Sequence, residues 1–257
     1  MKTLHSEAGL RCLERGKGNV IVLLHPIGMR AEFWDPVADL LASDHRVLAF
    51  DLPGFGESRR PPRAYTLDDV AREIIAALTD WSVDSAVFAG CSMGAMVAVG
   101  AALAAPELCK GVVVANSGLG FGDDGRAMIR QRAEAVRHSL ADTIEGTLER
   151  WFAPAFRDAN PETVGRVRTW LAGNEPEAVA RGWEAIAGLD YERRLRDLQM
   201  PLLAIAGELD AAASPAGLQK IASAAPGGIF IEIGGGGHFV PLEQPQAFSR
   251  AIRQLTD

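Results

Sequence analysis

Residues 85–94 read SAVFAGCSMG, and these ten residues decide the fold that we expect. The first five form a short apolar run, typical of a strand that is buried on both faces. The rest match the pattern Gly-x-Ser-x-Gly and lead into an apolar helical pattern over residues 93–104. In such a strand–turn–helix unit the serine occupies a strained turn that holds its hydroxyl clear of the sheet, and the glycines avoid collisions with the neighbouring strand and helix. We therefore predict that Ser92 is a nucleophile.

Similar apolar runs recur along the chain and predict further buried strands. They lie at residues 19–24, 46–50, 110–115, 202–206 and 228–233. Helical patterns lie between or after them, at residues 66–78, 93–104, 214–224 and 242–255. Regular alternation of strand and helix predicts an α/β protein with a mostly parallel, doubly wound sheet.

The alternation stops between Leu119 and Leu198, where amphipathic patterns predict helices over 127–148, 161–172 and 176–186. We expect residues 1–118 and 199–257 to form the core, and residues 119–198 to form an inserted helical lid. A lid placed after a core strand overhangs the carboxyl ends of the strands, where ligands bind in such sheets.

Three residues of the lid are candidates for contact with a substrate: Trp151, Arg157 and Trp183. Aromatic rings offer apolar contact surface, and a guanidinium binds a carboxylate through two hydrogen bonds. The alternative is that the aromatic side chains form the core of the lid and that the arginine faces water.

A serine hydroxyl is a weak nucleophile and needs a base that is oriented by an acid. His238 follows the last expected strand through a run of four glycines, so it is the candidate base. Asp210 follows the strand before it and is the candidate acid, with Glu208 as the alternative. After the strand that ends at residue 115, another place for such an acid, the chain has residues 116–117, Asn-Ser. Ser92, Asp210 and His238 then occur in the chain order expected of this kind of site.

Acyl transfer also needs N–H donors that stabilise the developing oxyanion. The backbone N–H of Met93 is one candidate, because it follows the nucleophile at a helix N-terminus. Ile27 is the other, in the loop after the first apolar strand, since Pro26 has no N–H. The glycine-rich stretch 51–58 lacks a phosphate-binding pattern, and we interpret it as a structural turn beside the pocket.

Charge and composition narrow the possible partners. The net charge of −7 argues against nucleic acids and anionic membranes. The longest apolar stretch is too short to cross a bilayer, and the first residues do not resemble a signal peptide. Cys12, Cys91 and Cys109 are scattered, which favours free thiols and no metal site. We expect a cytoplasmic protein with no cofactor and no metal; the oligomeric state stays open.

Taken together, the motifs resemble the α/β-hydrolase family over nearly the whole chain. They are HPIG at 25–28, DLPGFGES at 51–58, GCSMG at 90–94, GELD at 207–210 and GGGGHFVPLEQP at 234–245. Three segments look closest to the 3-oxoadipate enol-lactonases: FWDP at 33–36, SMG at 92–94 and RWFAPAFR at 150–157. The loop LPGFG at 52–56 and the lid around residues 181–183 depart from that branch.

This resemblance implies a hydrolase that cleaves a small carboxylic ester or lactone through an acyl-enzyme and needs no cofactor. Hydrolysis of a C–C bond in aromatic ring-cleavage products uses the same three residues and is an alternative. A ligand-sensing protein without catalysis is another. Haloalkane dehalogenases and epoxide hydrolases are disfavoured, because they resemble this fold but have an aspartate where this chain has Ser92.

Overall fold

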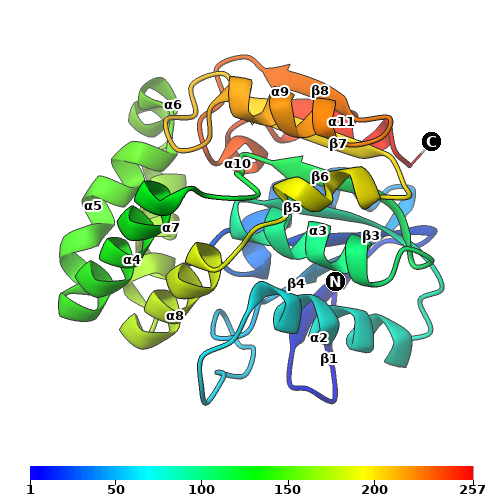
Figure 1. Ribbon diagram of the computed structural model, residues 1–257, viewed down its shortest axis with the longest axis horizontal. Coiled ribbons are helices and arrows are strands. Elements are labelled where there is room, and N and C mark those ends of the chain that lie inside the picture. The colour runs from blue at the N-terminus through cyan, green and yellow to red at the C-terminus, as the bar shows by residue number, and fades with distance from the viewer. Residues whose placement is uncertain (257) are drawn as a thin grey trace.

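A computed structural model describes residues 1–256, and an eight-stranded sheet runs through its centre (Figure 1). The strand order is β1-β2-β4-β3-β5-β6-β7-β8. The strands are β1 (Lys2–His5), β2 (Arg11–Arg15), β3 (Asn19–Leu24), β4 (His45–Phe50), β5 (Ala86–Cys91), β6 (Cys109–Ala115), β7 (Leu202–Gly207) and β8 (Ile229–Ile233). From β4 to β8 every neighbouring pair is parallel, whereas β2 is antiparallel to both β1 and β4. The predicted fold class and its six apolar strands are confirmed; β1 and β2 were not predicted.

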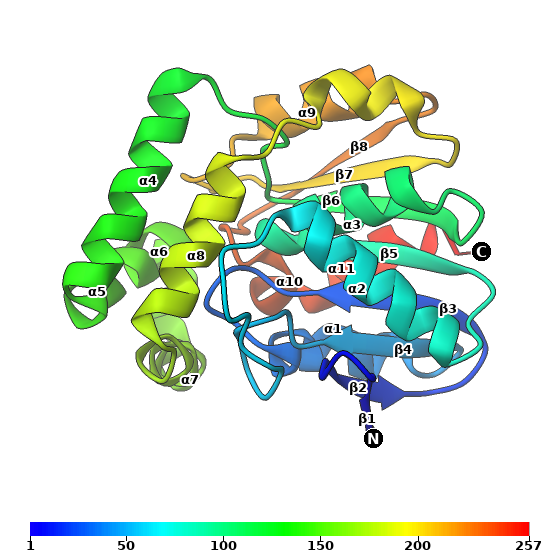
Figure 2. The same ribbon diagram turned by 60° about the horizontal axis from the view of Figure 1, so that its bottom comes forward.

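Helices cover both faces of the sheet (Figure 2). On one face lie α2 (Leu67–Asp80), α3 (Met93–Ala104) and α9 (Pro215–Ala224), and on the other lie α1 (Asp35–Leu41) and α11 (Pro245–Arg253). The helix predicted over 242–255 is in fact two, α10 (Val240–Glu243) and α11, because Pro245 begins a new helix. Proline is favoured at that first position and excluded from a helix interior.

Five helices lie between β6 and β7, beyond one end of the sheet (Figures 1 and 2). These lid helices are α4 (Asp123–His138), α5 (Leu140–Trp151), α6 (Pro154–Ala159), α7 (Pro161–Ala172) and α8 (Pro176–Ala187). The single helix predicted over 127–148 was wrong: extended backbone at Ser139 separates α4 from α5, and the Ser139 side chain caps α5. The chain returns to the core at Tyr191, whose N–H donates to the Leu119 carbonyl at 2.7 Å.

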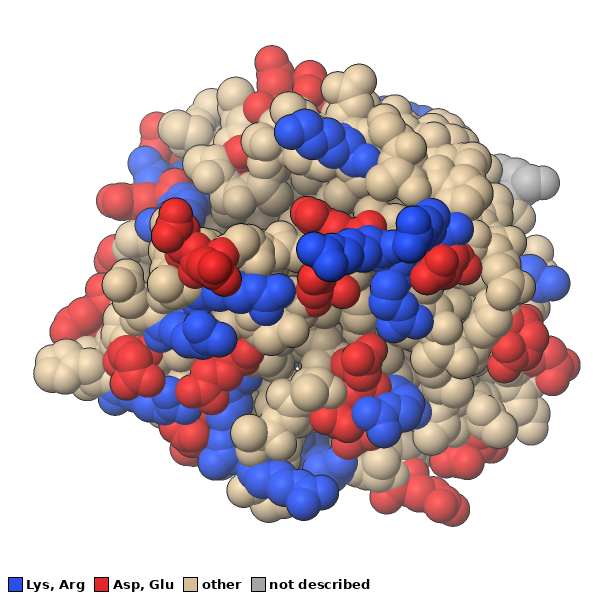
Figure 3. Space-filling view, in the orientation of Figure 1, with Lys and Arg blue, Asp and Glu red and all other residues tan. Residues whose placement is uncertain are grey.

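The central strands and the first turn of α3 are deeply buried, and most charged side chains lie on the surface. Every residue of β5 and β7 is buried, as the continuous apolar runs predict. Acidic and basic side chains are interspersed over the face in Figure 3. Among residues 1–256, no helix combines the length and the apolar character that a membrane span requires.

Candidate active site

The turn between β5 and α3 places Ser92 at the carboxyl end of the central strands. Ser92 has φ 53° and ψ −119°, a conformation that non-glycine residues rarely adopt. Its neighbours two positions away explain why the turn needs glycine. A Cβ on Gly90 would overlap the backbone of Gly94, and a Cβ on Gly94 would overlap the Leu24 carbonyl of β3. The predicted reason for the Gly-x-Ser-x-Gly pattern is confirmed.

The strained turn is held by bonds to the end of β6. The N–H of Ser92 donates to the Ala115 carbonyl at 2.9 Å, which continues the ladder between β5 and β6. The Ser117 hydroxyl donates to the Ser92 carbonyl at 3.0 Å. Both main-chain groups of Ser92 are therefore fixed, which leaves its hydroxyl as the group free to react.

Asp210 and His238 meet in a buried contact. The Nδ1 of His238 lies 2.9 Å from Oδ2 of Asp210, and both side chains are almost fully buried. The other oxygen, Oδ1, accepts the N–H groups of Ala212 at 2.7 Å and Ala213 at 3.0 Å. Burial by itself would raise the pKa of Asp210, but His238 and these donors outweigh burial and lower it. Asp210 is thus held as a carboxylate beside the imidazole.

Glu208, the alternative acid, is directed elsewhere. Its side chain is exposed, and its Oε2 accepts the Gly235 N–H at 2.8 Å. Of the two carboxylates in the GELD segment, Asp210 is the one bonded to His238.

Asn116 completes the surroundings of Asp210, and its part in the site was not predicted. Its side-chain Nδ2 donates to Oδ2 of Asp210 at 2.7 Å and to the Gly237 carbonyl at 3.1 Å. Asn116 therefore ties the acid to the loop that carries His238. It has φ 49°, and asparagine is among the few residues that tolerate this region. Its place directly after β6, where other members of such folds carry the acid, was the available signal.

Aromatic rings pack around His238. The Trp151 ring lies 5.8 Å from the imidazole between centroids, and Phe239 lies 6.0 Å from it. The N–H of Phe239 donates to the Trp151 carbonyl at 3.1 Å, which joins the end of α5 to the His238 loop. Trp151, a predicted substrate contact, is therefore next to the candidate base.

The two predicted oxyanion donors are buried and unpaired. Ile27 is 1% exposed and Met93 is 2% exposed. Within residues 1–256, neither backbone N–H has a hydrogen-bond acceptor. Buried N–H groups are almost always paired in folded proteins, so two unpaired donors beside the Ser92 turn indicate a place for an acceptor atom.

His25 sets the orientation of the Ile27 N–H. The N–H of Leu52 donates to Nε2 of His25 at 2.9 Å, so Nε2 is unprotonated and Nδ1 carries the hydrogen. That Nδ1–H donates to the Pro26 carbonyl at 2.7 Å. In a trans peptide the carbonyl and the following N–H point in opposite directions, so fixing the Pro26 carbonyl also fixes the Ile27 N–H. Complete burial lowers the pKa of His25 to about 4, which keeps it neutral.

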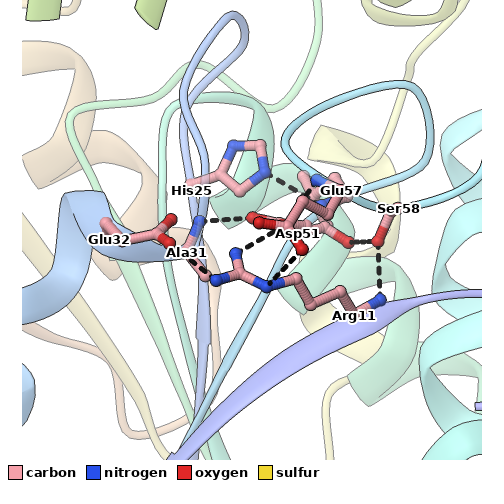
Figure 4. Close-up of polar contacts among 8 residues, drawn as sticks. Arg11, His25, Ala31, Glu32, Asp51, Glu57 and Ser58 are labelled. Carbon is pink, nitrogen blue, oxygen red and sulfur yellow. Dashed lines mark hydrogen bonds and ion pairs between the residues drawn. The ribbon is translucent and has the colours of Figure 1, made fainter. Parts of the chain in front are cut away.

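A buried ion-pair network fixes the loops on either side of His25 (Figure 4). Asp51 accepts the Ala31 N–H at 2.6 Å and the Glu57 N–H at 2.8 Å, and it binds the Arg11 guanidinium at 2.9 Å. Arg11 also binds Glu32 at 2.7 Å. Asp51 thereby joins the oxyanion loop, residues 25–31, to the turn at 51–58, which fits the interpretation of that turn as structural.

Glu243 is a buried carboxyl group that sequence reasoning missed. Its Oε2 accepts the N–H groups of Ala153 at 3.0 Å and Gly237 at 3.1 Å. Its Oε1 is buried and has no partner within residues 1–256. Burial raises the pKa of Glu243 to about 7, although these N–H groups oppose the rise. The side chain links the lid, through Ala153, to the residue before His238.

A cavity of about 260 Å³ lies between the lid helices and the oxyanion loop. Its lining residues are Ile27, Gly28, Arg132, Ala135, Val136, Leu140, Asp142, Thr143, Ile144, Gly146, Thr147, Arg150, Trp151, Leu171, Val179 and Trp183. Two of the three predicted lid residues, Trp151 and Trp183, are among them. Ser92 and His238 do not line it, but Ile27 does, and so does Trp151, whose ring lies 5.8 Å from that of His238.

Arg157, the third predicted lid residue, lies outside this cavity. Its Nε is 4.0 Å from Oδ1 of Asp158, and its side chain is partly exposed on the short helix α6.

Within residues 1–256, the cysteine thiols are unreactive and the potential metal ligands are dispersed. Burial raises the pKa of all three thiols, including Cys91 beside the nucleophile, so they are poor nucleophiles. Among residues 1–256, no three His, Cys, Asp or Glu side chains are grouped so as to hold a metal ion.

Known proteins are similar to this chain over almost its whole length. Residues 21–251 match the family described as the alpha/beta hydrolase family. A 3-oxoadipate enol-lactonase 2 of Acinetobacter baylyi is 28% identical, over 91% of this chain and 87% of its own. A pimeloyl-[acyl-carrier protein] methyl ester esterase of Xanthomonas oryzae pv. oryzae is 30% identical, over 93% and 96%. The structure of a thermophilic esterase from Thermogutta terrifontis with malate bound superposes with a TM-score of 0.91 at 25% identity, covering 99% of this chain and 97% of that one.

Proposed function

The chain belongs to the alpha/beta hydrolase family, and we propose on this basis that it is a serine hydrolase that cleaves a small carboxylic ester or lactone. The observation that carries the proposal is the buried bond between Asp210 and His238. The His238 loop contacts the residue before Ser92, because the Cys91 thiol donates to the His238 carbonyl at 3.5 Å. A carboxylate that holds Nδ1 of a histidine leaves Nε2 as the base for a serine hydroxyl.

In the proposed reaction, the Ser92 hydroxyl attacks the substrate carbonyl carbon while Nε2 of His238 takes its proton. Asp210 stabilises the resulting imidazolium. The N–H groups of Ile27 and Met93, which lack acceptors, donate to the oxyanion of the tetrahedral intermediate. The intermediate collapses, the C–O bond to the alcohol breaks, and His238 returns the proton to the alcohol oxygen. Water then attacks the acyl-enzyme, with His238 again as the base, and releases the acid and Ser92.

The relatives support this substrate class by their names. Two of them are named as acting on an enol-lactone and on a methyl ester, and a structural relative is an esterase with malate, a dicarboxylate, bound. The cavity beside Ile27 and Trp151 is of a size that suits a small molecule. These features favour a small ester or lactone over a large polymeric substrate.

Hydrolysis rates on a matched panel test the proposal. The panel contains short-chain methyl esters, five- and six-membered lactones, and the dienol product of an aromatic ring cleavage. We expect turnover of at least one ester or lactone, and its loss in Ser92→Ala. Turnover of the ring-cleavage product alone would favour C–C bond hydrolysis instead, and no turnover of any compound would favour a ligand-binding protein.

A further inference from the structure

Two arginines of the lid line the cavity without a carboxylate partner. Arg132 on α4 and Arg150 on α5 are both part of its wall. Arg132 is partly buried, and its guanidinium lies 5.3 Å from the centre of the Trp183 ring. Its side-chain hydrogen bond is a long one, 4.0 Å, to the Met128 sulfur. Within residues 1–256 neither arginine forms an ion pair, although Asp142 also lines the cavity. Arg132 is half-buried, whereas Arg150 is exposed at the cavity wall.

Several other arginines of the lid have a carboxylate partner, whereas Arg132 is half-buried without one. Arg137 binds Glu177 and Glu184, and Arg168 binds Glu145. Arg181 binds Glu177. Burying a cation without an anion is costly, so a half-buried arginine without a carboxylate indicates that its counter-charge comes from elsewhere.

The presence of a second arginine, Arg150, in the wall of the same cavity reinforces this indication. Burial lowers the pKa of Arg132, and the positive charge of Arg150 lowers it further. Like charges repel, and an anion bound between them would relieve the repulsion. The rest of the wall is largely apolar, with Ile27, Val136 and Trp183 among its residues, so a ligand would present an apolar middle and an anionic end.

We propose that Arg132 and Arg150 bind a carboxylate at the far end of the substrate from the bond that is cleaved. This inference rests on the proposed function, because Ile27, whose N–H is a proposed oxyanion donor, lines the same cavity. The substrate class is then a half-ester of a dicarboxylic acid, or a lactone that carries a carboxylate. The guanidinium of Arg132 makes the two-pronged contact, and Trp183 holds it in place from one side.

The test compares monomethyl and dimethyl esters of succinate, glutarate, adipate and pimelate, which differ at the far end only in charge. We expect the wild-type protein to prefer the monomethyl ester at one or more chain lengths. In Arg132→Gln the ratio of kcat/KM for the monomethyl to the dimethyl ester falls about 10- to 100-fold, mainly through KM. Arg150→Gln lowers the same ratio, and Arg132→Lys lowers it less than Arg132→Gln.

Arg166→Gln is the matched control. The Arg166 guanidinium also lies 5.3 Å from a tryptophan ring, that of Trp170 on the lid, but it does not line the cavity. We expect this variant to keep the wild-type ratio within about twofold, on the scale of a surface substitution. An equal ratio in wild type and in all three cavity-arginine variants would overturn the proposal, and so would an equal fall in Arg166→Gln.

Binding of glutarate to the Ser92→Ala protein separates this inference from the proposed function. Calorimetry at two salt concentrations should detect salt-sensitive binding that is lost in the double variants with Arg132→Gln or Arg150→Gln. Binding without turnover of any ester would support the anion site and contradict the proposed hydrolysis. Turnover of esters without any binding of glutarate, adipate or pimelate, and without a charge preference, would contradict the anion site alone. Circular dichroism checks that each variant is folded. If Arg132→Gln does not fold, the result for Arg150→Gln decides the outcome.

Discussion

The buried imidazole of His25 makes the free energy of unfolding depend on pH between about 6.5 and about 4. Its pKa falls from an ordinary 6.5 to about 4 because the imidazole is completely buried. The unfolded chain therefore takes up a proton near pH 6.5, whereas the folded protein does so only near pH 4. Each unit of pKa difference is worth about 1.4 kcal/mol, so the contribution of His25 to the free energy of unfolding falls by about 3 kcal/mol as the pH drops through this window.

The substitution His25→Asn removes this titration and keeps a donor near the Pro26 carbonyl. At pH 7.5 the variant should be less stable by about 1–3 kcal/mol, because the buried N–H of Leu52 loses its acceptor. Urea unfolding at pH 7.5, 6, 5 and 4 measures the gap between wild type and variant. We expect the difference in free energy of unfolding to shift by about 3 kcal/mol in favour of the variant between pH 7 and pH 4, so that it closes or reverses sign.

The same substitution at His5, whose side chain is exposed on β1, is the control. His5→Asn should leave the free energy of unfolding close to that of the wild type at every pH. A gap for His25→Asn that stays constant within about 1 kcal/mol from pH 7.5 to pH 4 would refute the neutral, buried tautomer and the reasoning drawn from it.

Three further predictions address the rest of the site. Asp210→Asn should lower kcat by roughly 10⁴, as the loss of the orienting acid does in such triads, while Glu208→Gln keeps near-normal kcat; steady-state kinetics showing the reverse would make Glu208 the acid. Gly94→Ala should destabilise the fold by at least about 1–3 kcal/mol, because the new Cβ overlaps the Leu24 carbonyl, and an unchanged thermal midpoint would contradict the packing described at this turn. The raised pKa of Glu243 means that the folded state retains its proton between pH 4.5 and about 7, so the contribution of Glu243 to stability falls by about 3 kcal/mol as the pH rises through that range; the difference in free energy of unfolding between wild type and Glu243→Gln, from denaturant titrations, should change by this amount.

The strands that sequence patterns predict are those whose signal is local. Each buried parallel strand is a continuous apolar run, and the two glycines around Ser92 reflect collisions within a single turn. β1 and β2 carry no such run. β2 reads RCLER, and its arginines are stabilised by carboxylates from other elements: Arg11 binds Asp51 and Arg15 binds Asp35. Such strands are specified by partners far along the chain, which a local pattern does not contain.

The sequence contains a signal for the boundary between α4 and α5. Ser139 is followed three residues later by Asp142, whose N–H bonds to the Ser139 side chain. This spacing is typical of a helix N-terminus. Because the amphipathic pattern continues across this boundary, it predicted one helix over 127–148 instead of two.

At the site, the candidate triad residues follow strands directly, so their positions along the chain predict that they meet at one edge of the sheet. Their supporting residues have no such marker. Asn116 bonds to Asp210, which is 94 positions away, and Glu243 bonds to Ala153, which is 90 positions away. Arg132 differs from the paired arginines of the lid only in what lies around it in three dimensions. Burial and pairing of this kind arise from tertiary contacts and are not encoded in a short motif.

Labelling with a fluorophosphonate, which reacts with activated serine hydroxyls, tests the central claim most directly. After digestion and mass spectrometry, the account predicts one label per chain, located on Ser92, with none on Ser92→Ala and much slower labelling of His238→Gln. Labelling of a different serine, or unchanged ester hydrolysis by a Ser92→Ala protein that remains unlabelled, would contradict the assignment of Ser92 as the nucleophile.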